Sequence, residues 1–179
     1  IMDFTCAILA GGRSTRMGRD KATLKVGDKA RIQQVYDKAH HVFTDILVVS
    51  SHHEHFCGVD APIVPDILPV QSSIVGIASA VLHARTPYVF VLACDMPFVT
   101  VQSIEHVLNE VRGEDIVIPR TENGFEPLHA AYSRSCLSVM LTRIGLQQLK
   151  ISGLFPFFSV KEIGNHPDFI NRGVSVFTN

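Results

Sequence analysis

Residues 4–21 read FTCAILAGGRSTRMGRDK, an apolar run that passes directly into a loop rich in glycine and cations. The run from Phe4 to Leu9 predicts a buried strand. Because Gly11 and Gly12 lack a Cβ, their backbone N–H groups can approach phosphate oxygens closely and the chain can adopt positive φ. Three cationic side chains of the loop can neutralise a polyanion: Arg13, Arg16 and Lys21. The stretch therefore predicts a strand followed by a phosphate-binding loop, and the alternative is a turn with solvated charges.

The spacing of this loop differs from that of two common glycine-rich loops. A P-loop has its lysine directly after the last glycine and before a serine or threonine, whereas here two residues separate Gly18 from Lys21. A dinucleotide-binding fingerprint has the pattern G-x-G-x-x-G at the start of a helix, and Gly11-Gly12 followed by arginine does not supply it. The sequence therefore matches neither loop.

Length and charge limit the class of protein. The 179 residues are most simply one α/β domain, residues 1–179, large enough to bury a substantial core. With 16 basic and 17 acidic residues the net charge is −1, so no overall field recruits nucleic acid. Although 46 % of the residues are apolar, no run is long enough to cross a bilayer, and we expect no leader segment before the first strand. We therefore expect a cytoplasmic protein with no nucleic-acid or membrane partner.

Apolar runs alternate with segments of helical periodicity along the rest of the chain. Strands are predicted at residues 46–49, 63–66, 88–93, 115–119 and 126–132. Helices are predicted at residues 32–42, 72–82, 101–111 and 136–149. Residues 22–30 are broken by a glycine–aspartate pair and predict a turn or a small hairpin. Because continuous apolar strands separated by helices are buried on both faces, the sequence predicts a three-layer α/β/α, Rossmann-like fold with a mostly parallel sheet.

The strand predicted at residues 88–93 ends in a CDMP turn at residues 94–97. In an open parallel sheet, ligands bind beyond the carboxyl ends of the strands, so Asp95 lies where chemistry is expected. A carboxylate there suits Mg²⁺, which takes few protein carboxylates and completes its shell with phosphate oxygens and water. The alternative is that Asp95 is the N-cap of the helix near Val101, but it lies several residues too early for that role.

Three other segments allow more than one interpretation. His52, His53 and His55 follow a strand, so they form either a transition-metal site or an ordinary polar loop. His129 either faces an acceptor pocket or is a hydrogen-bonded structural imidazole. The aromatic segment at residues 153–158 either fills the core, which we favour, or exposes a patch for a partner.

The glycine-rich loop resembles that of a known family. Its pattern, Leu-Ala-Gly-Gly, three residues, then Arg-Met-Gly-x-Asp-Lys, resembles the N-terminal loop of nucleotidyltransferases that act on sugar phosphates and molybdopterin. Among these the chain is most similar to the molybdenum cofactor guanylyltransferases. The turn at residues 94–97 is similar to their metal-binding turn, and residues 126–132 resemble their Gln-Pro-Leu-x-Ala-Leu-Tyr segment. This segment, and Ala10-Gly11-Gly12 in place of Ala-Ala-Gly, favour this family over its cytidylyl relatives.

The resemblance implies a nucleotidyltransferase fold and transfer of GMP from GTP to molybdopterin-bound molybdenum cofactor, with release of pyrophosphate. It implies Mg²⁺ as cofactor, with molybdenum cofactor delivery proteins or apo-molybdoenzymes as further partners. The catalytic residues it implies are Arg16, Lys21 and Asp95. The nucleotide-binding residues it implies are Leu9, Ala10, Gly11, Gly12, Lys21, Ser50, Asp66, Gly76 and Asp95. The metal ligands it implies are Asp95 and Asn171.

Two segments depart from the family pattern. Where the family has Gly-Pro-Leu-Ala-Gly, residues 72–76 read SSIVG and keep only Gly76. Near the end of the chain, Asn171 matches the first asparagine of the family's Phe-x-Asn-x-Asn motif, and Gly173 replaces the second. Two other functions therefore stay open: a nucleotidyltransferase that uses CTP or a sugar-phosphate acceptor, and a nucleotide-binding homologue with reduced or no catalysis. Nucleotide binding without turnover would distinguish the second from an enzyme.

Overall fold

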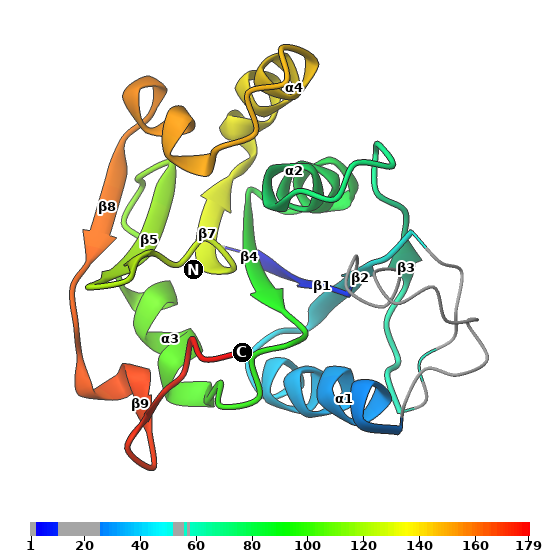
Figure 1. Ribbon diagram of the computed structural model, residues 1–179, viewed down its shortest axis with the longest axis vertical. Helices are drawn as coiled ribbons and strands as arrows, with labels where there is room; N and C mark the ends of the chain where they lie inside the picture. The colour runs from blue at the N-terminus through cyan, green and yellow to red at the C-terminus, as the bar shows by residue number, and fades with distance from the viewer. Residues whose placement is uncertain (1–2, 11–25, 52–55, 57) are drawn as a thin grey trace.

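Eight strands form one mixed sheet in the order β3-β2-β1-β4-β7-β5-β6, with β8 paired to β5 (Figure 1). The structure is a computed structural model that describes residues 3–10, 26–51, 56 and 58–179. The first four strands, all parallel, are β1 (Phe4–Leu9), β2 (Asp45–Val49), β3 (Ile63–Val64) and β4 (Tyr88–Ala93). The others are β5 (Ile116–Thr121), β6 (Gly124–Phe125), β7 (His129–Ser133) and β8 (Val160–Ile163), of which β8 runs parallel to β5.

The strand β7 enters the sheet between β4 and β5, antiparallel to both. It follows β5 through the β5–β6 hairpin and residues 126–128, a connection too short for the crossover that a parallel neighbour requires. Gly124, with a φ of 107°, lies in this hairpin, where the sequence predicts an Asn-Gly turn. The mostly parallel character predicted for the sheet is confirmed.

Helices cover both faces of the sheet (Figure 1). The helices α1 (Val26–His40) and α3 (Val101–Asn109) pack on one face, and α2 (Ser73–His83) and α4 (Leu137–Gly145) pack on the other. Neighbouring residues of β1 divide accordingly, since Cys6 and Ile8 join the first core cluster and Ala7 joins the second. This burial on both faces explains the continuous apolar strands and confirms the three layers. Among the described residues, no helix has both the length and the apolar content needed to cross a membrane.

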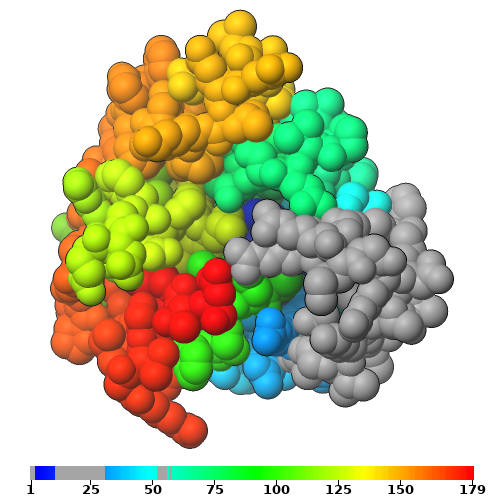
Figure 2. All heavy atoms as spheres, in the orientation of Figure 1, coloured from blue at the N-terminus to red at the C-terminus, as the bar shows by residue number. Residues whose placement is uncertain are grey.

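The end of the chain returns to the α1–α3 face. It contains the 3-10 turn η5 (Pro167–Phe169) and the antiparallel pair β9 (Ile170–Asn171) and β10 (Val174–Ser175). Val176 and Phe177 are buried in the core cluster of that face. In the space-filling view, this segment (red) lies beside the segment around residues 120–130 (yellow-green) (Figure 2).

The start of α1 corrects one sequence prediction. The helix begins at Val26, so the turn or hairpin predicted for residues 22–30 is wrong over residues 26–30, and residues 22–25 lie outside the described part of the chain. The Gly27-Asp28 pair lies in the first helical turn, where few intrahelical hydrogen bonds have yet formed.

Several predicted elements are shorter in the structure, most clearly a strand and a helix of the second half of the chain. The strand β7 starts at His129 instead of Glu126, because Pro127 has no N–H for the ladder and the His129 N–H closes a turn on the Glu126 carbonyl at 3.3 Å. The helix predicted to reach residue 149 ends at Gly145, and the chain then turns at Gln147 with a φ of 59°.

The aromatic segment is divided between core and surface. Residues Ile151–Phe157 form the 3-10 helix η4, in which Leu154 is fully buried. The Phe155 ring packs 4.8 Å from the Phe125 ring, whereas the Phe157 side chain is 58 % exposed. The core interpretation therefore holds for Leu154 and is wrong for Phe157.

Candidate functional site

The carboxyl ends of β1, β2 and β4 meet at one edge of the sheet, where backbone hydrogen bonds continue past the strands. The Ala10 N–H donates to the Val49 carbonyl at 2.9 Å. The Cys94 N–H donates to the Leu9 carbonyl at 3.2 Å. The residues at the ends of these three strands are therefore held side by side. Among them are Leu9, Ala10, Ser50 and Asp95, whose role in nucleotide binding stays a prediction from the family resemblance.

Ser50 and Asp66 extend this edge past β2 and β3. Ser50 is buried, and its N–H donates to the Val64 carbonyl at 2.9 Å. Two residues beyond Val64, Asp66 is partly buried, and desolvation raises the pKa of its carboxyl group. Hydrogen bonds to a partly desolvated carboxyl are electrostatically stronger than those in open water. Asp66 is therefore a suitable acceptor for the N–H donors of a bound ligand.

The first turn of α2 lies against the end of β1. A Cβ on Gly76 would lie 2.9 Å from Leu9 Cδ1, so glycine at this position permits the close approach of helix and strand. Ser72 occupies the N-cap position, although its side chain makes no capping hydrogen bond. The structure thus gives Gly76 a packing role directly beside a residue predicted to bind nucleotide.

The turn after β4 holds Asp95 at the same edge, with its side chain partly exposed. Met96 is buried beneath the turn, and the Val99 N–H donates to the Met96 carbonyl at 3.4 Å. Thr100 is the N-cap of α3 and forms a capping box with Ser103, at 3.0 and 3.2 Å. The capping position is therefore taken, which rules out the N-cap alternative for Asp95.

Asn171 reaches this turn from β9. Its Nδ2 donates to the Phe98 carbonyl at 3.0 Å, and Phe98 lies in the segment between Asp95 and α3. Asn171 therefore contacts the segment that follows Asp95, the other residue predicted to bind metal, and both metal roles stay predictions. A carboxylate and an amide oxygen belong to the class of ligands that Mg²⁺ accepts.

Glu126 lies near the same edge, and sequence reasoning gave it no role. The Ala93 N–H donates to the Leu128 carbonyl at 3.1 Å, which places residues 126–128 beside the end of β4. Glu126 is partly buried, and desolvation raises the pKa of its carboxyl group to about 6. The available signal was a glutamate at the position where the resembled segment has glutamine.

His129 is fully buried in the core. Its Nε2 lies 3.1 Å from the Ser103 carbonyl oxygen, and its ring meets the rings of Phe90 and Phe177 edge-on at 5.3 and 5.2 Å. Burial lowers its pKa to about 4, so the imidazole is neutral at neutral pH. The structural interpretation of His129 is confirmed.

Several predicted site residues lie outside the described part of the chain, and their roles stay predictions. They are Gly11, Gly12, Arg16 and Lys21 of the glycine-rich loop and the histidines His52, His53 and His55.

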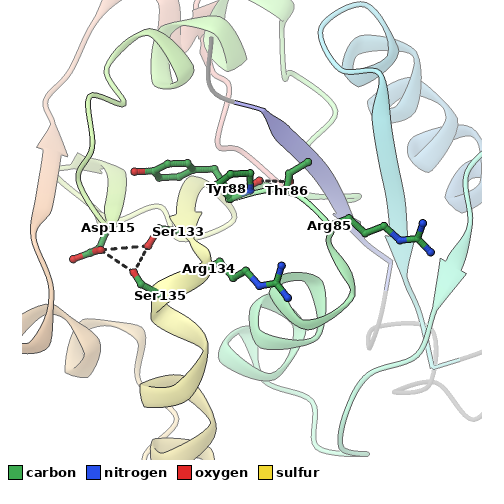
Figure 3. A pocket seen from close by; sticks show the side chains of 8 residues that line it. Arg85, Thr86, Tyr88, Asp115, Ser133, Arg134 and Ser135 are labelled. Carbon is green, nitrogen blue, oxygen red and sulfur yellow. Dashed lines mark hydrogen bonds between the residues drawn. The ribbon is translucent and has the colours of Figure 1, made fainter.

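An open hollow of about 430 Å³ lies at the opposite edge of the sheet, lined by Arg85, Tyr88, Asp115 and Ser135 among others (Figure 3). Burial alone would raise the pKa of Asp115, but hydrogen bonds from Ser159 and Ser135 outweigh it and hold the pKa below its usual value. The Ser135 hydroxyl lies 2.8 Å from Asp115 and the Ser159 hydroxyl 3.1 Å. Asp115 therefore links the start of β5 to the segments that contain Ser135 and Ser159. The hollow is separate from the strand ends described above.

Comparisons with known proteins identify similar chains. A family model described as the MobA-like NTP transferase domain matches residues 6–153. The molybdenum cofactor guanylyltransferase of Desulfosudis oleivorans is 31 % identical over 161 residues, covering 89 % of this chain and 80 % of that protein. A solved protein of Aquifex aeolicus VF5 gives a TM-score of 0.80 at 28 % identity, covering 96 % of this chain and 94 % of that one. The molybdopterin-guanine dinucleotide biosynthesis protein A of Archaeoglobus fulgidus gives a TM-score of 0.71 at 26 % identity, covering 89 % of this chain and 83 % of that one.

Proposed function

The chain belongs to the MobA-like NTP transferase family, and from this premise we propose that it transfers GMP from GTP to molybdopterin-bound molybdenum cofactor. The observation that carries the proposal is the edge where Leu9, Ser50 and Asp95 meet beyond parallel strands. The similarity to a relative named for guanylyl transfer to this cofactor supports the choice of both substrates. Molybdenum cofactor delivery proteins or apo-molybdoenzymes would be its further partners.

In the proposed reaction, an oxygen of the terminal phosphate of molybdopterin attacks the α-phosphorus of GTP in line. The new P–O bond forms as the bond to the bridging oxygen of pyrophosphate breaks, and pyrophosphate leaves. The protein contributes by positioning and by neutralising charge. Gly11 and Gly12 would hold phosphate oxygens with backbone N–H groups, and Arg16 and Lys21 would stabilise the leaving pyrophosphate.

Asp95 and Asn171 are the proposed ligands of Mg²⁺. The Asp95 carboxylate is partly exposed, and the Asn171 amide contacts the segment that follows Asp95. Both side chains offer oxygen atoms, which are the ligands that Mg²⁺ prefers. Since Asn171 Nδ2 donates to the Phe98 carbonyl, Oδ1 would be the ligand atom. When bound, Mg²⁺ would neutralise charge on the phosphate oxygens.

The base is proposed to be guanine, read by groups at the ends of β1, β2 and β3. Guanine presents N1–H and N2–H₂ donors, and the partly desolvated Asp66 carboxyl is an acceptor at this edge. The proposed pocket comprises Leu9, Ala10, Ser50, Asp66 and Gly76. A site that satisfies these donors disfavours a base without them, because buried polar groups would then stay unpaired.

The proposal predicts that GTP binds more tightly than ATP, CTP and UTP in competition with Mg²⁺ present. Pyrophosphate release with molybdenum cofactor as acceptor should then require GTP. Equal affinity for GTP and CTP would contradict the guanine assignment. Only the broader proposal, that the chain is a nucleotidyltransferase, would then stand. Tight GTP binding without pyrophosphate release would favour the nucleotide-binding homologue with no catalysis.

A further inference from the structure

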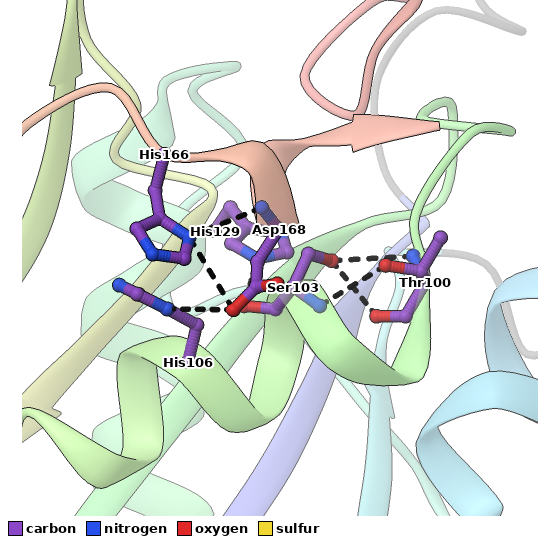
Figure 4. A network of polar contacts seen from close by, with 6 residues as sticks. All are labelled: Thr100, Ser103, His106, His129, His166 and Asp168. Carbon is purple, nitrogen blue, oxygen red and sulfur yellow. Dashed lines mark hydrogen bonds and ion pairs between the residues drawn. The ribbon is translucent and has the colours of Figure 1, made fainter. Parts of the chain in front are cut away.

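Three potential metal ligands converge where α3 meets the C-terminal segment (Figure 4). His106 lies in the last turn of α3, and His166 and Asp168 lie at the start of η5. Asp168 Oδ2 is 2.9 Å from His106 Nδ1 and 3.4 Å from His166 Nδ1. The potential ligand atoms of the three residues all lie within 4.8 Å of one another. The tertiary fold brings them together, since about 60 residues separate His106 from the other two.

These separations suit a small divalent ion. Bonds of 2.0–2.2 Å in a tetrahedral shell place neighbouring ligand atoms roughly 3.3–3.6 Å apart. The distance from Asp168 Oδ2 to His166 Nδ1, 3.4 Å, lies in this range, and the distance to His106 Nδ1, 2.9 Å, is shorter and would lengthen on binding an ion. The remaining pair can close by a movement of His166, whose side chain is 44 % exposed.

The donor set selects the class of metal. Two imidazoles and one carboxylate are the ligands of many zinc sites, which keep a fourth position for water. Mg²⁺ and Ca²⁺ prefer oxygen donors and so fit this cluster poorly. A metal at His166 Nδ1 replaces the hydrogen bond that this atom accepts from the Asp168 N–H at 3.1 Å, and water can solvate that exposed N–H instead.

We propose that His106, His166 and Asp168 form a binding site for a zinc-like divalent ion that fastens the C-terminal segment to α3. The Phe169 ring packs 5.0 Å from the His106 ring, so the ion would stabilise an existing contact. Two residues further on, Asn171 hydrogen-bonds to the Phe98 carbonyl beside Asp95. The proposal stands independently of guanylyl transfer, since it concerns residues outside the nucleotide edge.

The test measures zinc binding to the full chain without an affinity tag, after removal of bound metal by a chelator. His52, His53 and His55 are first replaced by glutamine, because that sequence cluster is itself able to bind zinc. Isothermal titration with ZnCl₂ should then show one equivalent per chain. His166→Gln, at a partly exposed side chain, should weaken binding by more than the roughly 10- to 100-fold typical of losing an outer-shell partner. His41→Gln, at an exposed histidine outside the cluster, is the matched control and should leave binding unchanged.

Two further measurements separate a metal site from a plain His–Asp ion pair. Co²⁺ should give visible d–d absorption that disappears in His166→Gln and in Asp168→Asn, with folding checked by circular dichroism. Zn²⁺ should raise the Tm of the histidine-replaced background, and His166→Gln in that background should remove the increase. Zinc affinity that is unchanged by both His166→Gln and Asp168→Asn would overturn the proposal and leave only an ion pair.

Discussion

Asp95 acquires its proposed role from position. It follows β4, whose six residues are all buried, and it stands beside the ends of β1 and β2 with its side chain partly exposed. A carboxylate held there meets phosphate oxygens only with a cation between them, because like charges repel at close range. The charge of Asp95, more than its shape, is therefore the property to change.

We predict that Asp95→Asn lowers Mg²⁺-dependent turnover by about 10²–10³-fold, the range for loss of one preorganised charge-stabilising group. Steady-state rates across an Mg²⁺ titration measure the effect, and circular dichroism checks the fold. Asp45→Asn is the matched control, because exposed Asp45 begins β2 at the opposite edge of the sheet. An Asp95→Asn titration that coincides with that of the wild type would remove Asp95 from the metal site.

Glu126 makes stability depend on pH. Desolvation raises its pKa from 4.5 to about 6 in the folded chain. Between these values the folded state binds more protons than the unfolded state, so stability falls as the pH rises through the window. The lowered pKa of His129 acts in the opposite direction, and comparing variant with wild type cancels that contribution.

Replacing Glu126 by glutamine should therefore increase stability above pH 6 relative to the wild type, and this gain should grow as the pH rises from 4.5 to 6. Urea unfolding at a series of pH values measures both effects. Glu122→Gln, at an exposed glutamate of the same hairpin, should leave the pH dependence as in the wild type. Parallel curves for Glu126→Gln and the wild type would show that the Glu126 carboxyl titrates normally.

At the scale of elements, the buried strands were predictable because burial on both faces is a local property of sequence. Residues 4–9 and 88–93 were predicted with the bounds that β1 and β4 have. The start of α1 was missed because Gly27-Asp28 looks like a turn locally, while packing of the later helical face extends the helix. The antiparallel pairing of β7 with β4 and β5 depends on the lengths of the connecting segments. The periodicity of apolar residues does not indicate strand direction.

The contact between α2 and β1 gives a prediction about two glycines. Alanine in a helix is favoured over glycine by roughly 1 kcal/mol. Gly145→Ala, at the end of α4 where a Cβ meets no atom within 4 Å, should gain up to about this amount. Gly76→Ala should gain less and should weaken GTP binding, because its Cβ pushes Leu9, which is proposed to line the nucleotide pocket.

Urea unfolding and GTP titration of the two alanine variants measure these effects side by side. Gly145→Ala serves as the control for helix propensity alone. Gly76→Ala could gain as much stability as Gly145→Ala and bind GTP like the wild type. In that case Leu9 can move aside at no cost, and the packing role given to Gly76 is wrong.

At the scale of the whole molecule, the site combines local and distant contributions. The position of Asp95 was predictable, because parallel strands bring their carboxyl ends to one edge, whereas the family resemblance indicated Ser50 and Asp66. The contact of Asn171 with Phe98 joins segments more than 70 residues apart, and only the family resemblance indicated Asn171 beforehand. The convergence of His106 with Asp168 has no counterpart in sequence spacing at all. Both contacts depend on how the end of the chain packs against α3.

Phe177 secures that packing. Its side chain is 7 % exposed, and its ring lies 5.2 Å from the His129 ring and 5.1 Å from the Phe169 ring. We predict that Phe177→Ala costs about 3–5 kcal/mol of unfolding free energy, as expected for deleting a buried aromatic ring. Since Phe169 precedes Asn171 by two residues, the variant should also bind Mg²⁺ and GTP more weakly.

The matched control is Phe157→Ala, because the Phe157 side chain is 58 % exposed and lies at the surface of η4. Its removal should change the unfolding free energy by less than about 1 kcal/mol and leave nucleotide binding intact. Urea unfolding at neutral pH gives the stability of both variants, and GTP titration with Mg²⁺ gives their affinity. Equal losses of unfolding free energy in Phe177→Ala and Phe157→Ala would mean that the buried Phe177 ring stabilises the fold no more than an exposed ring does. A stability loss at Phe177 with unchanged GTP affinity would instead separate the packing of this segment from the position of Asn171.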